Sequence, residues 1–285
     1  MNADILKKLQ LKELQILKEV IKVCNELGIQ YFAAYGTALG AVRHKGFIPW
    51  DDDIDLGMKR EDFDRFIREA PALLPPHLFV QYRDTDPDYN ILHAKVRDTS
   101  TAFLEPGWEH NRGNQGIFID IFPWDYHPKN AIRSLIFGLR KRYYQNIIST
   151  KKSVSYHWKQ SGIKNKLRAL LVPLVNLFYS DRQKAARKMD NMLRSLKPSS
   201  IICDQEFRKL HYPAEWFEGT ISVPFEDISI NIPTGCHEYL SKRYGDYMKY
   251  PPIEDQAPRH FGGIVDTEKS YTYYVSAKNE QQHDS

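Results

Sequence analysis

The sequence predicts an α/β (α+β) fold in which helices flank a mixed sheet, and a basic helical insertion interrupts the chain. Apolar residues recur at three- and four-residue intervals through residues 5–27, which indicates an amphipathic helix ended by Gly28. Apolar and acidic residues alternate through 53–56, as in a half-buried strand, and residues 117–122 form a second strand-like run. At 285 residues the chain can bury a substantial core.

The remaining elements follow from local patterns. Residues 31–35 are expected to form a strand that leads to Gly36, and residues 38–43 a short helix. Residues 60–74 are expected to form a covering helix ended by two prolines. Further strands are predicted at 78–82, 91–96, 100–104 and 117–122, a hairpin at 221–223 and 228–232, and a helix after Gly235 that carries His237.

The acidic strand is the first candidate for a functional site. Asp53 and Asp55 are separated by one apolar residue, so in a strand both carboxylates face one side while Ile54 faces the core. Two carboxylates on one face repel each other unless a cation lies between them. Mg²⁺, held by carboxylates and substrate phosphates, fits this arrangement best.

The acidic run has three other interpretations. A solvated acidic loop does not explain the alternation. A calcium EF-hand loop starting at Asp51 would need glycine and glutamate where the chain has Leu56 and Asp62. A glycosyltransferase Asp-x-Asp site, with Mn²⁺ as a frequent metal, stays open as an alternative.

Gly36 and Thr37 lie upstream of these acids. Glycine lets the backbone approach a ligand closely, and Thr37 is placed to cap the following helix. Amides at a helix start bind phosphate. The pair therefore indicates a site for donor phosphate, which favours phosphoryl transfer over glycosyl transfer.

Asp120 lies within a strand of large apolar residues. An ionised carboxylate there needs compensation, either from backbone amides or from a metal. From its own surroundings the two explanations are equal.

Residues 36–57 together resemble the LicD family, bacterial relatives of fukutin-type proteins with a nucleotidyltransferase fold. Residues 95–101, 118–123 and 244–248 and the prolines at 251–252 are also similar to that family. The resemblance is weak between about residues 129 and 200. It implies a nucleotidyltransferase-like core over 1–128. A shift in composition marks an insertion over 129–200, and a C-terminal part over 201–275 is expected to pack on the core. Residues 276–285 are polar without apolar periodicity and are expected to form a disordered tail.

The resemblance further implies a metal-dependent transferase that moves phosphocholine, or another phospho-alcohol such as ribitol or glycerol phosphate, from a CDP-linked donor to a glycan. The expected glycans are teichoic acid, lipopolysaccharide and capsule. With Asp53 and Asp55, Asp120 becomes a third catalytic carboxylate. Four acids are expected to hold Mg²⁺ or Mn²⁺: Asp51, Asp53, Asp55 and Asp120. Asp120 or a metal-bound neighbour would take the proton of the acceptor hydroxyl. The residues expected to bind donor phosphate are Gly36, Thr37, Arg43, Lys95 and Arg97.

Choline would be bound by aromatic faces, which attract a quaternary ammonium. The aromatic residues near the acids in sequence are Trp50, Trp108, Trp124 and Tyr126. The alternative is that these rings belong to the core.

The insertion is strongly basic. Residues 129–188 carry fifteen lysines and arginines and one acid, giving +14 against +4 for the whole chain. Apolar stretches at 135–139 and 167–179 accompany these charges, which suits peripheral contact through 129–190 with an anionic leaflet that carries a lipid-linked acceptor. The alternative is packing of the same faces on the core. No nucleic-acid motif accompanies the basic residues, so nucleic acid is not expected as a partner.

Bulk composition indicates an ordinary globular protein, with 42% hydrophobic and 27% charged residues. The three cysteines lie far apart, which favours neither a disulfide framework nor a structural zinc site. Neither a signal peptide nor a membrane span is expected. We therefore expect a cytoplasmic location, either free or peripheral at the inner face of the plasma membrane.

Overall fold

The computed structural model describes residues 2–86, 89, 91–104, 113–150, 182–204, 210–258 and 263–275. A seven-stranded mixed sheet forms its centre, and the expected α+β class is confirmed. The tail at 276–285, much of the insertion (151–181) and Trp108 lie outside the described residues.

The sheet is built around the long strand β6 (Ile117–Tyr126). β2 (Asp55–Lys59) pairs with it in parallel, and β4 (Ala94–Asp98) pairs with it in antiparallel orientation. β1 (Phe32–Ala33) and β3 (Leu78–Gln81) extend the sheet on either side. β7 (Ile201–Asp204) pairs with the last residues of β6, and β8 (Tyr212–Pro213) pairs with β7.

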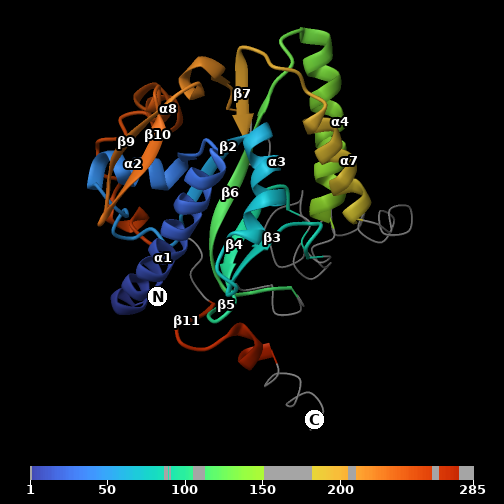
Figure 1. Ribbon diagram of the computed structural model, residues 1–285. Coiled ribbons are helices and arrows are strands. Elements are labelled where there is room, and N and C mark those ends of the chain that lie inside the picture. Colours follow the sequence, from blue (N-terminus) through green and yellow to red (C-terminus); the bar gives the residue numbers. More distant parts are fainter. Residues whose placement is uncertain are drawn as a thin grey trace.

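Helix α1 (Ala3–Leu27) covers the sheet and contacts β6 and β4 (Figure 1). Its N-terminus is capped by Asn2, whose side chain accepts a bond from the Ile5 amide at 2.8 Å. Its C-terminus is capped by Gly28 at φ 63°, as expected from the sequence. α3 (Arg60–Glu69) and the short 3-10 helix η1 (Ala70–Ala72) occupy the span where one longer helix was expected.

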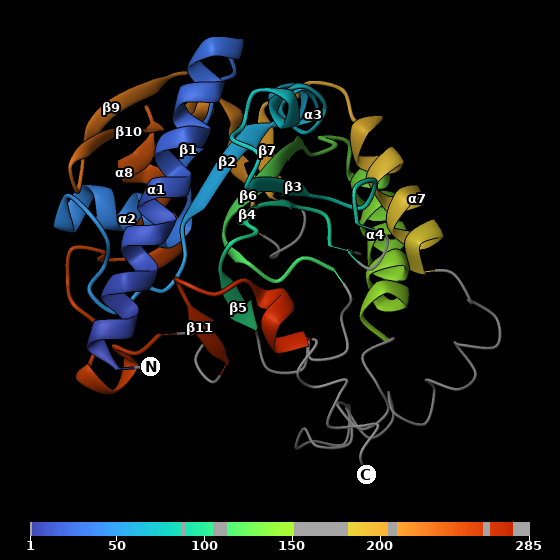
Figure 2. The ribbon, with the colours of Figure 1, turned by 60° about the horizontal axis from the view of Figure 1, so that its bottom comes forward.

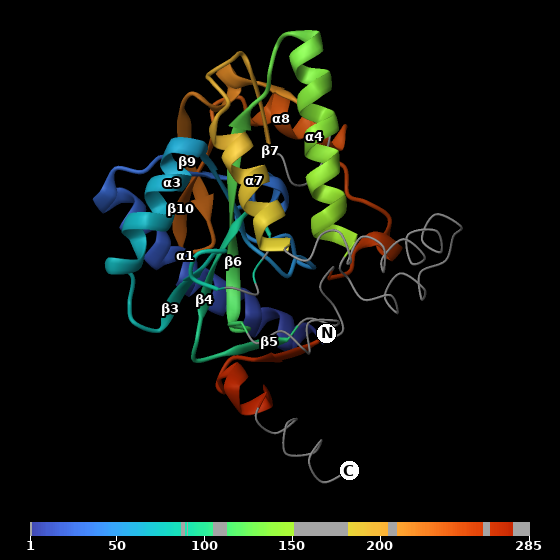
Figure 3. The same ribbon diagram turned by 90° about the vertical axis from the view of Figure 1, so that its right-hand side faces the viewer.

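Two groups of elements flank this centre on opposite sides (Figures 1 and 2). On one side lie α2 (Tyr35–His44), α8 (Cys236–Tyr244) and the hairpin of β9 (Thr220–Phe225) and β10 (Ile228–Pro233). On the other, α4 (Ala131–Thr150) packs against α7 (Arg182–Arg194), as Figure 3 also shows. The remaining short elements are β5 (Ala102–Leu104), which pairs with β11 (Ile264–Asp266), and the 3-10 helices η2 (Ala214–Phe217) and η3 (Ile253–Asp255).

Buried ion pairs fasten α7 to the centre. Arg60 of α3 donates two bonds to Asp125 of β6, at 2.7 and 2.8 Å, and a third to Asp190 of α7 at 3.0 Å. Arg83 also bonds Asp190, at 2.9 Å. Bidentate, buried geometry of this kind holds elements in one orientation.

Two local predictions are wrong. The strand expected at 31–35 contains only Phe32 and Ala33, because helix α2 begins at Tyr35. Asp53 precedes β2, which begins at Asp55, instead of lying within it. Ile54 is nevertheless fully buried, as its place in the pattern predicted.

Among the described residues, we find no helix with the length and apolar composition needed to cross a bilayer.

Candidate active site

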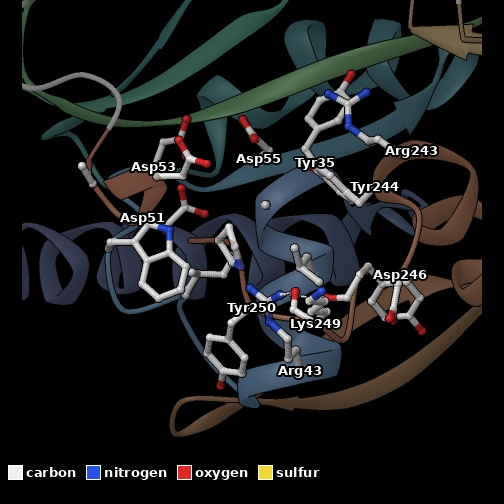
Figure 4. Close-up of a pocket in the computed structure, with 18 of the residues that line it drawn as sticks. Tyr35, Arg43, Asp51, Asp53, Asp55, Arg243, Tyr244, Asp246, Lys249 and Tyr250 are labelled. Atoms are coloured by element: carbon white, nitrogen blue, oxygen red, sulfur yellow. Dashed lines mark hydrogen bonds between the residues drawn. The ribbon is translucent and has the colours of Figure 1, made fainter. Parts of the chain in front are cut away.

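A cavity of about 880 Å³ opens between α2, the acidic segment before β2 and the C-terminal residues 243–257. Asp51, Asp53 and Asp55 lie on one side of it, and Arg43, Lys249 and Tyr250 lie on the other (Figure 4). The cavity therefore combines a group of carboxylates with positive and aromatic side chains.

The acids come together from a loop and two strands. Carboxylate oxygens of Asp51, Asp52 and Asp53 lie within 4.8 Å of one another, a spacing that a metal ion can bridge. Asp55 and Asp120 are direct neighbours in the parallel pairing of β2 with β6. Both are buried, although both line the cavity.

Burial and like charge act together on Asp55. Its pKa is raised well above the ordinary value, first by burial and then by Asp53 and Asp120. A buried carboxyl in this state favours either a proton or a cation beside it. This donor set fits a divalent cation that prefers oxygen ligands.

The pKa of Asp120 is shifted in the opposite direction to that of Asp55. Burial would raise its pKa, but Lys95 at 2.7 Å and His93 at 3.2 Å outweigh burial and lower it. The ion pair with Lys95 therefore makes Asp120 a weaker base than a free carboxylate.

Helix α1 contacts the acidic loop through Gln10. Gln10 donates a bond to the Asp51 carbonyl at 2.9 Å. Glu13 is fully buried, and neither of its oxygens has a hydrogen-bond partner within the described part of the chain. Burial, followed by Asp53 and Asp52, raises its pKa. Glu13 was missed from the sequence because it occupies an ordinary inward position of the helix pattern.

Gly36 lines the cavity, whereas Thr37 does not. A Cβ atom at Gly36 would lie 2.5 Å from an oxygen of Asp51, so glycine permits close approach of that carboxylate. Thr37 accepts a hydrogen bond from the Asp55 amide at 2.8 Å and thereby joins α2 to β2. It does not cap the helix, because α2 begins two residues earlier, at Tyr35.

The three basic residues predicted to bind phosphate have different surroundings. Arg43 lines the cavity, where it donates to the carbonyls of Tyr247 and Lys249 at 2.8 and 3.2 Å. Lys95 is buried against Asp120. Arg97 is buried, and it bonds Gln81 and donates to the Gly116 carbonyl at 2.7 Å. Neither Lys95 nor Arg97 lines the cavity.

Of the described aromatic residues predicted to bind choline, one lines the cavity and two do not. Trp50 lines the cavity, with its ring 6.3 Å from that of Tyr250. Trp124 is fully buried in the core, with its ring 4.6 Å from that of Phe217. Tyr126 is not among the lining residues. Trp124 lies on the same face of β6 as Asp120, but the rings of Phe32, Phe217 and Tyr239 cover it.

Sequence reasoning gave no site role to the C-terminal wall. Arg243, Tyr244, Lys249 and Tyr250 all line the cavity. The guanidinium of Arg243 lies 4.2 Å from the ring centre of Tyr35, and that of Arg43 lies 4.8 Å from the ring centre of Tyr250. The motifs at 244–248 and 251–252 were the available signal for this wall.

Comparison with known proteins shows the family of the chain. Residues 28–167 match the family described as LicD/FKTN/FKRP, nucleotidyltransferase domain. The chain is similar to the Lipopolysaccharide cholinephosphotransferase LicD of Haemophilus influenzae, with 31% identity over 90% of this chain and 97% of that protein. The chain belongs to the LicD family. The matched region includes Gly36 and all four candidate metal ligands.

LicD-family similarity extends to animal proteins. The Ribitol 5-phosphate transferase FKRP of mouse and that of human are each 46% identical over 117 residues, which is 40% of this chain and 20% of theirs. The named relatives are transferases, so the resemblance expected from the motifs is confirmed at the level of the family.

Proposed function

We propose that this LicD-family chain transfers phosphocholine from CDP-choline to a sugar hydroxyl of a cell-surface glycan, such as lipopolysaccharide, teichoic acid or capsule. The observation that carries the proposal is the cavity that sets Asp51, Asp53 and Asp55 opposite basic and aromatic side chains. The relative that matches most of the chain is named a cholinephosphotransferase, which favours choline as the alcohol.

Asp51, Asp53, Asp55 and Asp120 are the residues proposed to hold Mg²⁺, because they line one cavity and Asp55 is buried among like charges. When bound, the cation would neutralise the donor diphosphate and the charge on the departing CMP. Mn²⁺ could replace it at the same oxygen ligands.

Arg243 and Lys249 are proposed to bind the donor phosphates from the opposite wall. Arg43 acts differently: its bonds to two carbonyls hold the 247–249 segment in place. Trp50 and Tyr250 present neighbouring rings to the cavity and would face the quaternary ammonium. Each such contact is worth about 0.5–2 kcal/mol.

In the reaction, the acceptor hydroxyl oxygen forms a bond to the choline-bearing phosphorus, and the bond from that phosphorus to CMP breaks. The hydroxyl proton passes to Asp53, which is half-buried at the cavity wall. Asp120 is less suited to this role because Lys95 and His93 lower its pKa and make it a weaker base.

Ribitol phosphate is the second candidate group, because residues of this chain match a ribitol 5-phosphate transferase at 46% identity. That donor would use the same acids and basic residues. It would gain nothing from Trp50 and Tyr250, since a polyol needs polar partners.

A donor panel tests the proposal. Purified protein with Mg²⁺ would be given CDP-choline, CDP-ribitol, CDP-glycerol or UDP-sugars, and nucleotide release and thermal shift would be measured. We expect the wild type to release CMP from CDP-choline and Asp53→Asn to lose this activity. Asp227→Asn, which changes an exposed aspartate, is the control and should release CMP as the wild type does. A response confined to CDP-ribitol or CDP-glycerol would replace the alcohol, whereas a response to UDP-sugars alone would overturn the reaction class.

The acceptor is proposed to be lipid-linked and reached at a membrane surface. α4 exposes Ile132, Leu135 and Leu139, by 60 to 69%, and carries no acidic residue. An apolar face among basic residues favours anionic bilayers. In a flotation assay with anionic vesicles, the wild type should float with the vesicles and a Leu135→Ser/Leu139→Ser variant should not. Equal flotation of the two proteins would reject this membrane contact.

A further inference from the structure

Three side chains that can bind a metal meet at the end of β6 that lies away from the acids. His127 follows β6, Cys203 lies in β7, and His211 precedes β8. One ligand atom from each lies within 4.8 Å of the other two. His127 is 8% exposed and Cys203 is 1% exposed.

The sheet register explains why residues so distant in sequence converge. Asp125 pairs with Cys203, and Ile202 pairs with Tyr212. His127 lies two positions after Asp125, so its side chain is on the same face as that of Asp125. His211 lies one position before Tyr212, so in the antiparallel pairing it is opposite Cys203. The sequence spacing of the cysteines could not reveal such a group, because its members come from separate strands.

The hydrogen bonds of His127 leave one ring nitrogen available. Its Nε2 is 2.9 Å from the Ser134 hydroxyl of α4. Its Nδ1 is buried and has no hydrogen-bond partner among the residues that the structure describes. If Nε2 carries the proton and donates it to the Ser134 hydroxyl, Nδ1 has a free lone pair. This is the usual arrangement of a metal-bound histidine. An unsatisfied buried nitrogen is costly, and a cation would remove that cost.

The charge state of the group suits a metal as well. The rings of His127 and His211 lie 4.0 Å apart, and burial lowers the pKa of His127 to about 4 and also lowers that of His211. Both imidazoles are therefore neutral near pH 7, the form that binds metals. Lys141 of α4 and Lys242 of α8 are the charged groups that lower these pKa values further. Burial raises the pKa of the Cys203 thiol to about 12, and Lys141 offsets only part of that rise, so the metal itself would have to displace the thiol proton.

We propose that His127, Cys203 and His211 form a site for Zn²⁺ that ties the ends of β6, β7 and β8 together. Two nitrogens and one sulfur are ligands typical of zinc, and the fourth tetrahedral position would be left to water. His211 also lines a second cavity of about 560 Å³, from which solvent reaches the group. Zinc bond lengths place ligand atoms about 3.4 Å apart, so these side chains would close in by about 1 Å.

This site is separate from the acidic one. Asp120 and His127 are seven positions apart along an extended strand, which corresponds to roughly 23 Å. The metal would anchor β8. The chain after β8 continues through β9, β10 and α8 to Arg243 and Tyr250, which line the catalytic cavity. Its expected role is therefore structural.

Metal content tests the proposal directly. The full chain would be expressed with zinc, dialysed against metal-free buffer and analysed by mass spectrometry, with Asp53→Asn as the parent to weaken cation binding at the acidic site. We expect about one zinc per chain in this parent, and less than about a tenth of that when Cys203→Ser or His211→Ala is added. Cys236→Ser, which alters another buried cysteine, is the matched control and should keep its zinc.

Cobalt substitution covers the case in which a variant fails to fold. Co²⁺ bound to the parent should give the near-ultraviolet absorption of a cobalt–thiolate bond, and added zinc should remove it. A strong chelator should lower the melting temperature of the parent but not that of Cys203→Ser. The proposal is overturned if the parent binds no zinc and shows no thiolate band, or if Cys203→Ser binds zinc as well as Cys236→Ser does.

Discussion

Replacing Lys95 with methionine should destabilise the protein strongly. The Lys95 ammonium lies 2.7 Å from an oxygen of Asp120, and both side chains are less than 10% exposed. Methionine keeps the length and the contact with the Phe118 ring but leaves the Asp120 carboxylate buried without its main counter-charge. Breaking one side of a buried pair costs about 3–5 kcal/mol. At about 2–4 °C per kcal/mol, the melting temperature should fall by roughly 6–20 °C.

The chain contains a matched control for this substitution. Lys18 lies 2.6 Å from Asp227, but those side chains are 40% and 65% exposed. Exposed pairs contribute less than about 1 kcal/mol, so Lys18→Met should be nearly silent. Urea denaturation of both variants in buffer with a chelator would measure the difference. Similar midpoints for the two variants, both close to wild type, would refute the argument that burial makes the Lys95 pair important.

The pH dependence of the same variant has a definite sign. Lys95 lowers the pKa of Asp120 in the folded state, so the pair contributes its stability above the ordinary aspartate pKa of about 4 and loses it as the pH falls. The stability gap between wild type and Lys95→Met should therefore be largest near neutral pH and shrink below about pH 4. A gap that widens on acidification would contradict this assignment.

The remaining predictions concern the cavity. Gly36→Ala should lower CMP release by about tenfold or more, because its Cβ would meet Asp51 at 2.5 Å and displace that ligand. Gly138→Ala, whose Cβ would meet no atom within 4 Å, should leave the rate unchanged, and equal rates for both would reject the displacement. Trp50→Leu should raise the KM for CDP-choline several-fold with an unchanged melting temperature. Trp124→Leu should instead cost about 2–4 kcal/mol of stability, since that ring is fully buried; the opposite pattern would assign the choline contact to Trp124.

Much of the fold and part of the site could be predicted from local sequence patterns. The amphipathic spacing of α1 and its terminal Gly28 predicted that helix, and alternation predicted the β9–β10 hairpin. Asp51, Asp53 and Asp55 are close in sequence, so their meeting in one cavity depended little on the rest of the chain. Motif resemblance supplied the family.

Tertiary structure alone decided which basic residues face the cavity. Lys95 and Arg97 were expected to bind phosphate, but pairing of β4 with β6 places Lys95 on Asp120, and Arg97 is buried with bonds to Gln81 and Gly116. Arg243 and Lys249 occupy the wall instead, although nearly two hundred residues separate them from the acids. Local patterns report burial and secondary structure, whereas the partner of a charge depends on strand register and on contacts between distant segments.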